Sequence, residues 1–75
     1  MDPKLQSVIA DILGLSPDLI HAGTSTDTES VWDSLRHMNL VFALEDAFGV
    51  RFEDDEIATL TSVARIEAAL RDRAG

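Results

Sequence analysis

The apolar side chains between residues 3 and 13 recur with the spacing of a single helical face. Asp2 stands just before this stretch and can cap a helix, and Pro3 fits the first helical position. Gly14 can end the helix because glycine readily takes the left-handed backbone conformation. The pattern therefore predicts an amphipathic helix over residues 3–13. Its inward stripe consists of Leu5, Val8, Ile9, Ile12 and Leu13.

A second helix is predicted over residues 34–48, between Asp33 as its N-cap and Gly49 as its end. Its apolar residues spread around more than one face. This distribution is typical of a helix that is buried on several sides or that presents part of its surface to partners. The residues of this helix that we expect in the core are Val41, Leu44 and Phe48.

The connection between these two helices, residues 15–33, carries no helical stripe. Within it, the run Ser16-Pro17-Asp18 predicts a single turn, with Leu19 and Ile20 available to anchor it. A loop this long in so small a domain is unusual and often functional.

Two further helices are predicted after Gly49. A short one is expected around residues 55–60, and a longer one over residues 63–72, capped by Thr61 or Ser62. No stretch alternates between apolar and polar residues for long enough to predict a strand. The chain is therefore predicted to be all-α: a small four-helix bundle of three main helices and one short helix, with a long loop between helices one and two. The inward residues expected in the last two helices are Ile57, Leu60, Val63, Ile66 and Leu70.

The 75 residues are expected to form one domain, 1–75, whose size limits what it can enclose. A domain this small buries only about 60% of the surface that its unfolded chain exposes. It can close one modest core, but it cannot also enclose a deep pocket shielded from water. This disfavours an enzyme with a sequestered active site.

The charge and the missing residue types narrow the choice of partners and location. Formal net charge is −8, so nucleic acids and anionic membranes are poor partners, whereas basic patches on other proteins are good ones. The chain has no cysteine and no apolar run long enough to span a membrane. Its first residues, Met1-Asp2-Pro3-Lys4, lack the basic and apolar regions of a signal peptide. We expect a cytoplasmic monomer.

Ser34 is the side chain whose position points most clearly to chemistry. It falls at the first position of the predicted helix 34–48, where its hydroxyl projects outward at the positive end of the helix. Free N–H groups and the helix dipole stabilise an anion at an exposed site of this kind by about 0.3–1 kcal/mol. A phosphodiester attached to Ser34 would therefore be held favourably.

The tripeptide Asp33-Ser34-Leu35 resembles the Asp-Ser-Leu signature of acyl carrier proteins and related peptidyl carrier domains. The likeness continues to residue 50, through an aliphatic middle and a Leu-acid-acid-x-Phe ending. Farther on, Ile57-Ala58-Thr59-Leu60-Thr61-Ser62-Val63 is similar to that family's entry into its last helix. The first helix and the turn at residues 16–18 also match. The resemblance covers nearly the whole chain, in order and at matching spacing.

The resemblance implies a carrier and not an enzyme. In that family a phosphopantetheinyl transferase, using coenzyme A and magnesium, joins 4′-phosphopantetheine to the serine that here is Ser34, directly after Asp33. The thiol of this arm holds acyl groups as thioesters, which suits a chain without cysteine. The other implied partners are an acyl-loading ligase or synthetase and acyl-transferring or condensing enzymes.

By the same resemblance, Leu35, Met38 and Phe42 would flank the serine on the outward side of the helix and meet partner enzymes. All three are apolar, however, and the core is an equally open location for them on the residues alone. For Phe42 the core is at least as good an interpretation, because aromatic residues at helical spacing are usually buried.

The chain departs from the family pattern just after the serine. Fatty-acid-synthesis carriers usually have acids there and again one turn later, where this chain has Arg36 and Asn39. Only Glu45 and Asp46, farther along, keep the acidic character of the partner-binding helix. Partners that grip the early acids with arginines should dock less well. This favours a dedicated carrier for a specialised pathway, such as a polyketide, a modified lipid, or a glycan or amino-acid building block.

The residues around the serine also have ordinary structural interpretations. Arg36 and His37 are expected to be solvated side chains, and Trp32 is expected to pack the long loop against helix 34–48.

Three alternative functions use parts of the same pattern. Ser34 and His37 lie three apart on one helix and could approach each other in a hydrolytic set, but nothing supplies an oxyanion hole. The acidic run 53–56 could bind calcium, although it lacks the ligand spacing and central glycine of an EF-hand loop. A small acidic bundle with an apolar groove could also be a phosphopantetheine-free protein-interaction module.

Overall fold

The computed structural model describes residues 1–74. Their elements follow one another as α1 (Pro3–Leu13), the 3-10 turn η1 (Pro17–Leu19), α2 (Ser34–Phe48), α3 (Asp54–Ile57) and α4 (Val63–Ala74). These residues contain no β-strand, only an isolated bridge between Ser25 and Ser62. The predicted all-α bundle of three main helices and one short helix is confirmed. No helix within residues 1–74 has the length and apolar character needed to cross a bilayer.

Local capping residues set the ends of α1 and α2. Asp2 and Asp33 each accept a hydrogen bond of 2.9 Å from a backbone N–H in the first turn that follows. Gly14 and Gly49 end the two helices in the left-handed conformation, with φ of 68° and 65°. Both helices therefore begin and end where the sequence predicts.

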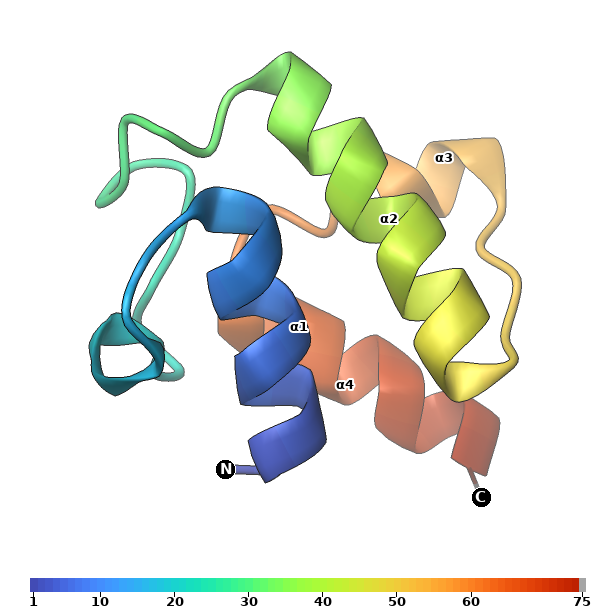
Figure 1. Cartoon of the computed structure of the whole chain (residues 1–75). Helices are drawn as coiled ribbons and strands as arrows, with labels where there is room; N and C mark the ends of the chain where they lie inside the picture. Colours follow the sequence, from blue (N-terminus) through green and yellow to red (C-terminus); the bar gives the residue numbers. More distant parts are fainter. Residues whose placement is uncertain (75) are drawn as a thin grey trace.

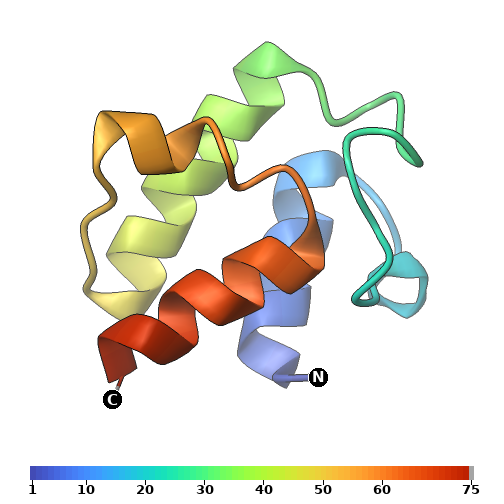
Figure 2. The same cartoon turned by 180° about the vertical axis from the view of Figure 1, so that it is seen from behind.

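The main helices pack around one core, and α3 lies at its edge (Figures 1 and 2). In both views α1 and α2 lie next to each other and α4 crosses them on one side. The short helix α3 lies beside the N-terminal half of α2. The long loop after η1 passes the end of α1 and enters α2 at the end of the bundle opposite the N-terminus. The start of α2 is thus bordered by this loop and by α3.

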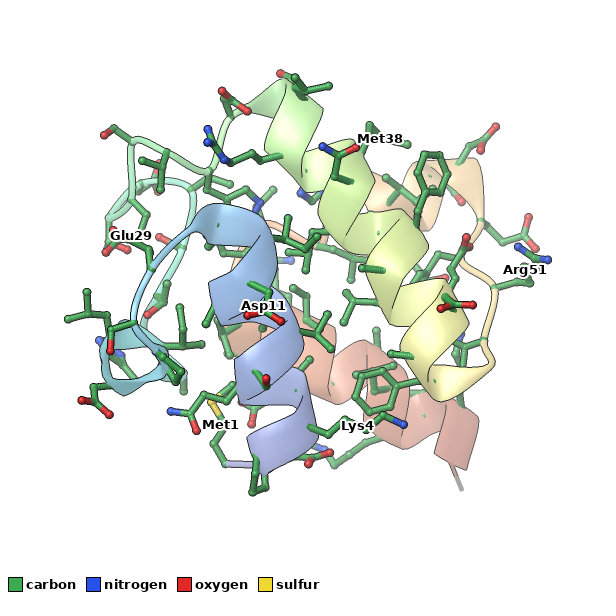
Figure 3. The ribbon with its side chains drawn as sticks, viewed as in Figure 1. Met1, Lys4, Asp11, Glu29, Met38 and Arg51 are labelled. Carbon is green, nitrogen blue, oxygen red and sulfur yellow. The ribbon has the colours of Figure 1, made fainter. Side chains whose placement is uncertain are left out.

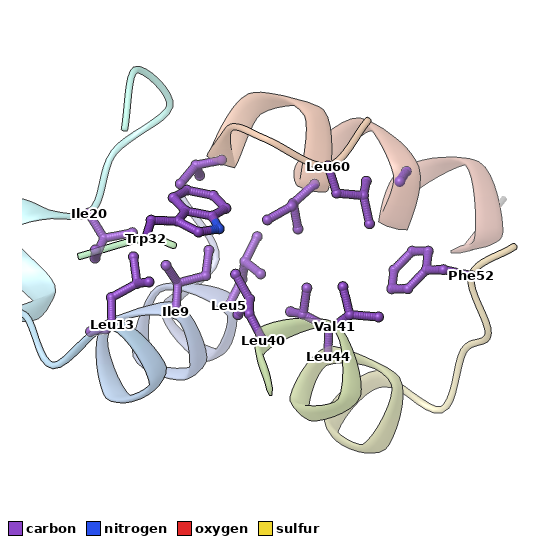
Figure 4. Packing of buried hydrophobic residues seen from close by; sticks show 14 residues of the cluster. Leu5, Ile9, Leu13, Ile20, Trp32, Leu40, Val41, Leu44, Phe52 and Leu60 are labelled. Atoms are coloured by element: carbon purple, nitrogen blue, oxygen red, sulfur yellow. The ribbon is translucent and has the colours of Figure 1, made fainter. Parts of the chain in front are cut away.

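The core is mostly aliphatic, with Trp32 toward one end and Phe52 toward the other (Figure 4). Val41 and Leu44 are buried as predicted. Phe48 is only partly buried, and Lys4 Nζ lies 4.8 Å from the centre of its ring. The buried residues of the cluster are Leu5, Ile9, Ala10, Leu13, Ile20, Trp32, Leu40, Val41, Leu44, Phe52, Leu60, Val63, Ile66 and Ala69.

Hydrogen bonds hold the long loop against the start of α4. The buried hydroxyl of Thr24 donates to the carbonyl of Leu19 at 3.1 Å. The Thr26 N–H donates to the Thr61 carbonyl at 3.0 Å, and the Val63 N–H donates to the Thr24 carbonyl at 2.9 Å. These hydrogen bonds offset the desolvation of the polar groups, so the loop can lie against the helices without leaving them unpaired.

The anchoring of η1 differs from the prediction. Leu19 is exposed, and only Ile20 of the predicted pair is buried. The 3-10 turn ends at Leu19, and the extended residue after it is the one that reaches the core.

The short helix is also shorter than predicted, because it spans Asp54–Ile57 and not residues 55–60. Thr59 ends it by donating its hydroxyl to the carbonyl of Glu56 at 2.7 Å, and the chain then turns to bury Leu60. The last helix is longer than predicted and extends to Ala74. Of its two expected caps, Ser62 accepts a first-turn N–H at 3.1 Å.

Arg73, near the end of α4, contacts both α3 and the segment before it. Its guanidinium pairs with the Glu56 carboxylate and donates to the carbonyl of Arg51 at 3.1 Å. It also lies 4.6 Å from the centre of the Phe52 ring. The hydrogen bond from Arg73 lowers the pKa of Glu56 below its ordinary value, against a smaller opposing effect of desolvation. This arrangement connects α3 to α4.

Replacing Glu56 by glutamine is expected to destabilise the domain more at neutral pH than in acid. A carboxyl group whose folded pKa is lowered adds stability above its unfolded pKa, and this stability is lost as the pH falls through the folded pKa. The pKa of Glu56 is lowered from 4.5, so the loss occurs below that value. Urea unfolding at about pH 7 and about pH 3 should therefore show a smaller decrease of the midpoint for Glu56→Gln at the lower pH.

The matched control for this prediction is Asp11→Asn, which changes an exposed carboxyl group on α1. It should leave the midpoint of urea unfolding unchanged at the higher pH. An equal effect of Glu56→Gln at both pH values would show that the ion pair does not carry the difference.

Candidate functional site

Ser34 is the first residue of α2, and its side chain is exposed. Asp33 accepts hydrogen bonds from two of the neighbouring backbone N–H groups. Its carboxylate accepts from the Arg36 N–H, and its carbonyl accepts from the His37 N–H at 2.8 Å. Within residues 1–74, no acceptor takes up the N–H groups of Ser34 and Leu35. The Ser34 hydroxyl therefore stands at a positively polarised helix end with two backbone donors free for an anion.

An open groove of about 490 Å³ begins at Ser34 and lies between the start of α2 and α3. This volume falls within the range of small-molecule sites, which are mostly apolar with a few polar groups. A separate cavity of about 500 Å³ lies between α1, the end of α2 and α4 and contains none of the predicted site residues. The groove beside Ser34 is lined by Thr26, Trp32, Asp33, Ser34, His37, Met38, Asp54, Ile57, Ala58 and Thr61.

His37 is not the solvated side chain that the sequence predicts. It is half-buried, its Nδ1 accepts a hydrogen bond from the Trp32 indole N–H at 3.0 Å, and its Nε2 lies 2.8 Å from the carbonyl oxygen of Ile57. Trp32 is only 3% exposed and packs as expected. Because both ring nitrogens of His37 have other partners, it is not placed to act as a base toward Ser34. The hydrolytic alternative therefore lacks its base.

The three apolar candidates on α2 all lie at the surface. Leu35 is 71% exposed, Phe42 59% and Met38 37%, so the core interpretation of these residues is wrong. Met38 lies in the N-terminal half of α2 (Figure 3). The three residues stand at i, i+3 and i+7 and share one face of the helix. Together they form an apolar surface next to Ser34 with no covering element among residues 1–74.

The charged and polar candidates on α2 do not all share this surface. Arg36 is exposed and its guanidinium lies 3.9 Å from the Asp33 carboxylate. Asn39 and Asp46 are exposed as well. Glu45, by contrast, is half-buried and accepts the N–H of Phe52 at 3.0 Å. It fixes the segment after Gly49, which leaves Asp46 as the exposed acid of α2.

The acidic run 53–56 has structural roles. Asp54 begins α3, and Glu56 pairs with Arg73. In the part of the chain that the structure describes, no three His, Asp or Glu side chains come together as a metal site.

Sequence reasoning missed the connection that runs from Trp32 through His37 to Ile57. Its last partner is a backbone carbonyl twenty positions away from His37, and a carbonyl leaves no mark in the sequence. The presence of Trp32 beside the Asp-Ser-Leu tripeptide was the only available signal.

Comparison with known proteins settles the family. The sequence model of the family described as "Phosphopantetheine attachment site" matches residues 3–70. Acyl carrier protein 3 of Ralstonia nicotianae is 35% identical, over 93% of this chain and 85% of that protein. The chain belongs to the acyl carrier protein family. The acyl carrier protein of Akkermansia muciniphila is 34% identical, over 91% of this chain and 85% of that protein. The acyl carrier protein of Bdellovibrio bacteriovorus is 30% identical, over 95% of this chain and 91% of that protein.

This carrier is not an enzyme, and its cofactor is a covalently bound 4′-phosphopantetheine. The residues at the start of α2 fit such a group. An exposed hydroxyl is available for a phosphodiester, the N–H groups of Ser34 and Leu35 are free to face its phosphate, and the groove extends from the same residue. When bound, the arm supplies the thiol that this cysteine-free chain lacks.

Proposed function

We propose that Ser34 carries the 4′-phosphopantetheine arm and that this protein holds acyl intermediates on it as thioesters. The observation that supports this most strongly is the exposed hydroxyl at the first position of a fifteen-residue helix, with two unpaired N–H groups beside it. The Ser34 oxygen forms the new bond to phosphorus, the nucleotide part of coenzyme A leaves, and the hydroxyl proton is released. Asp33 contributes by capping the helix, since its carboxylate is already bonded to the Arg36 N–H.

The test is the intact mass of the protein after incubation with coenzyme A, magnesium and a broad-specificity phosphopantetheinyl transferase. The expected result is a gain of one phosphopantetheine group per chain. A chain that gains no mass, under conditions that fully modify a control carrier, would support the alternative of a phosphopantetheine-free interaction module.

The enzymes that use the arm are proposed to meet the apolar surface formed by Leu35, Met38 and Phe42. These enzymes are the transferase, an acyl-loading ligase or synthetase, and acyl-transferring or condensing enzymes. An exposed Leu and Phe on one helix face are costly to leave in water and are typical of a surface that partners cover. Their position next to Ser34 would bring a docked active site close to the arm.

A specialised biosynthetic pathway is proposed because the early part of α2 lacks acidic side chains. Arg36 and Asn39 are the exposed polar residues of α2 that follow the serine most closely, and Glu45 accepts a hydrogen bond from the Phe52 N–H. Asp46 is the remaining exposed acid of this helix. A partner that docks through arginines toward early acids would meet a positive charge at Arg36, and like charges at an interface suppress a wrong partner.

The double variant Arg36→Asp with Asn39→Glu is expected to improve recognition by fatty-acid-synthase enzymes. Restoring two charge pairs of about 1 kcal/mol or less each should raise kcat/KM for a condensing enzyme by up to about thirtyfold. The control, Arg65→Asp with Ala64→Glu, makes the same change in net charge at exposed positions on α4. An equal gain from the control would mean that net charge, and not the docking helix, determines recognition.

A further inference from the structure

The sulfur atoms of this chain belong to two methionines, because the sequence has no cysteine. Met1 precedes α1 and is 49% exposed, and Met38 lies on α2 and is 37% exposed. Both side chains are therefore open to solvent. Of the two, Met38 is the one that belongs to the apolar surface next to Ser34.

Met38 stands in the middle of that surface. It comes three residues after Leu35 and four residues before Phe42, so it is a neighbour of both on one face of α2. The same side chain also lines the groove that begins at Ser34. A partner that covers both Leu35 and Phe42 therefore has to cover Met38 as well.

The thioether of Met38 is the one group of the apolar surface that a mild oxidant changes. A peroxide transfers one oxygen atom to the sulfur: the O–O bond breaks, an S–O bond forms, and hydrogen peroxide leaves as water. The sulfur is oxidised by two electrons and becomes a polar sulfoxide. Methionine sulfoxide reductases reverse the step with two electrons from a dithiol. Leu35 and Phe42 are hydrocarbons and do not react in this way.

Oxidation of Met38 should change the surface and leave the fold intact. The buried residues of α2 are Leu40, Val41 and Leu44, and Met38 lies outside their core cluster. On the free protein a sulfoxide at this position is hydrated. Under a docked partner it loses this water among apolar side chains, and burying an unpaired polar group costs free energy. The cost therefore falls on the complex and not on the free carrier.

We propose that Met38 is an oxidation site that controls docking: as a thioether it admits partner enzymes to the apolar surface, and as a sulfoxide it weakens their binding until it is reduced. This inference rests on the proposed function, in which the enzymes that serve the arm on Ser34 meet this surface. An oxidised carrier is then slow to receive its arm and slow to pass on its acyl group.

The test uses the protein without its arm, so that no thiol is present to be oxidised. The chain is treated with hydrogen peroxide, the peroxide is removed, and attachment of the arm by a broad-specificity phosphopantetheinyl transferase is measured. Intact mass should show two added oxygen atoms, one for each methionine. The KM for the oxidised chain should rise at least about fivefold, the effect of burying one unpaired polar group, while kcat stays within about twofold.

Met38→Leu is the matched control, because leucine is apolar, of similar size and free of sulfur. This variant keeps Met1, so peroxide should add one oxygen atom and leave the KM unchanged. Met38→Gln places a polar side chain at the same position and should raise the KM without any peroxide. The midpoint of urea unfolding should be equal for the treated and untreated wild type, which separates docking from stability. Methionine sulfoxide reductases with a dithiol should restore the original KM.

The results that would overturn the proposal are distinct from those that would overturn the attachment of the arm. An unchanged KM for the oxidised wild type, or oxygen added to Met1 alone, would overturn the role of Met38. An equal rise of the KM in oxidised Met38→Leu would also overturn it, because the effect would then arise elsewhere. A KM that the reductases do not restore would overturn the reversible control. An untreated chain that accepts no arm, while a control carrier does, would overturn the attachment at Ser34 and the docking control with it.

Discussion

A chain with alanine in place of Ser34 is expected to gain no phosphopantetheine under conditions that fully modify the wild type. The substitution removes the only atom at the start of α2 to which the arm would be joined, so the expected effect is complete loss. The fold should be unaffected, because the Ser34 side chain is exposed and alanine is well tolerated at a helical position. Intact-mass measurement reports the outcome directly.

The matched control is Ser30→Ala, an exposed serine in the loop that precedes α2. It should be modified as completely as the wild type, because it is not at a helix N-terminus. A mass gain in Ser34→Ala, or its loss in Ser30→Ala, would place the attachment elsewhere in the chain.

Replacing Trp32 by alanine is expected to lower the free energy of unfolding by about 3–5 kcal/mol, as removal of a large buried aromatic usually does. The indole is 3% exposed and is part of the core cluster. Its loss also leaves Nδ1 of His37 without its donor. Small domains have total stabilities of about 5–15 kcal/mol. This variant should therefore be close to unfolded, or its midpoint of urea unfolding should be strongly lowered.

Urea unfolding followed by far-ultraviolet circular dichroism measures this effect, because Trp32 is the single tryptophan and its fluorescence is lost in the variant. Phe42→Ala is the control: it also truncates an aromatic residue, but one that is 59% exposed. Its effect should stay within about 0.5 kcal/mol. Equal stabilities of the two variants would contradict the buried position of Trp32.

The parts of the fold that depend on local chemistry could be predicted from the sequence. Asp2 and Asp33 cap their helices, and Gly14 and Gly49 end them, because capping depends on residues within one turn of each other. The bounds of α3 were not predictable in this way. Its end is set by the Thr59 hydroxyl bonding back to the Glu56 carbonyl and by the burial of Leu60.

The orientation of α2 illustrates a second limit. Its apolar residues surround the helix, so periodicity could not separate Phe42, which is exposed, from Leu44, which is buried. The packing of α1 and α4 decides which face is covered. Glu45 and Asp46 look equivalent in sequence, yet only Glu45 meets the N–H of Phe52. The role of His37 depends in the same way on tertiary contacts, with Trp32 and with a distant carbonyl.

The candidate site was predictable to the extent that it is a helix start. The exposed hydroxyl of Ser34 follows from its place after the Asp33 cap. The groove does not, because α3 and the long loop supply residues such as Ile57, Ala58 and Thr26 from distant parts of the chain.

Fragmentation mass spectrometry of the modified wild-type protein tests the attachment at Ser34 most directly. The protein is loaded by the transferase, digested, and the peptide that carries the arm is fragmented to locate it. The expected result is phosphopantetheine on Ser34 and on no other hydroxyl-bearing residue. An arm on Ser30, or on any serine or threonine other than Ser34, would contradict the assignment of the start of α2 as the working site of this carrier.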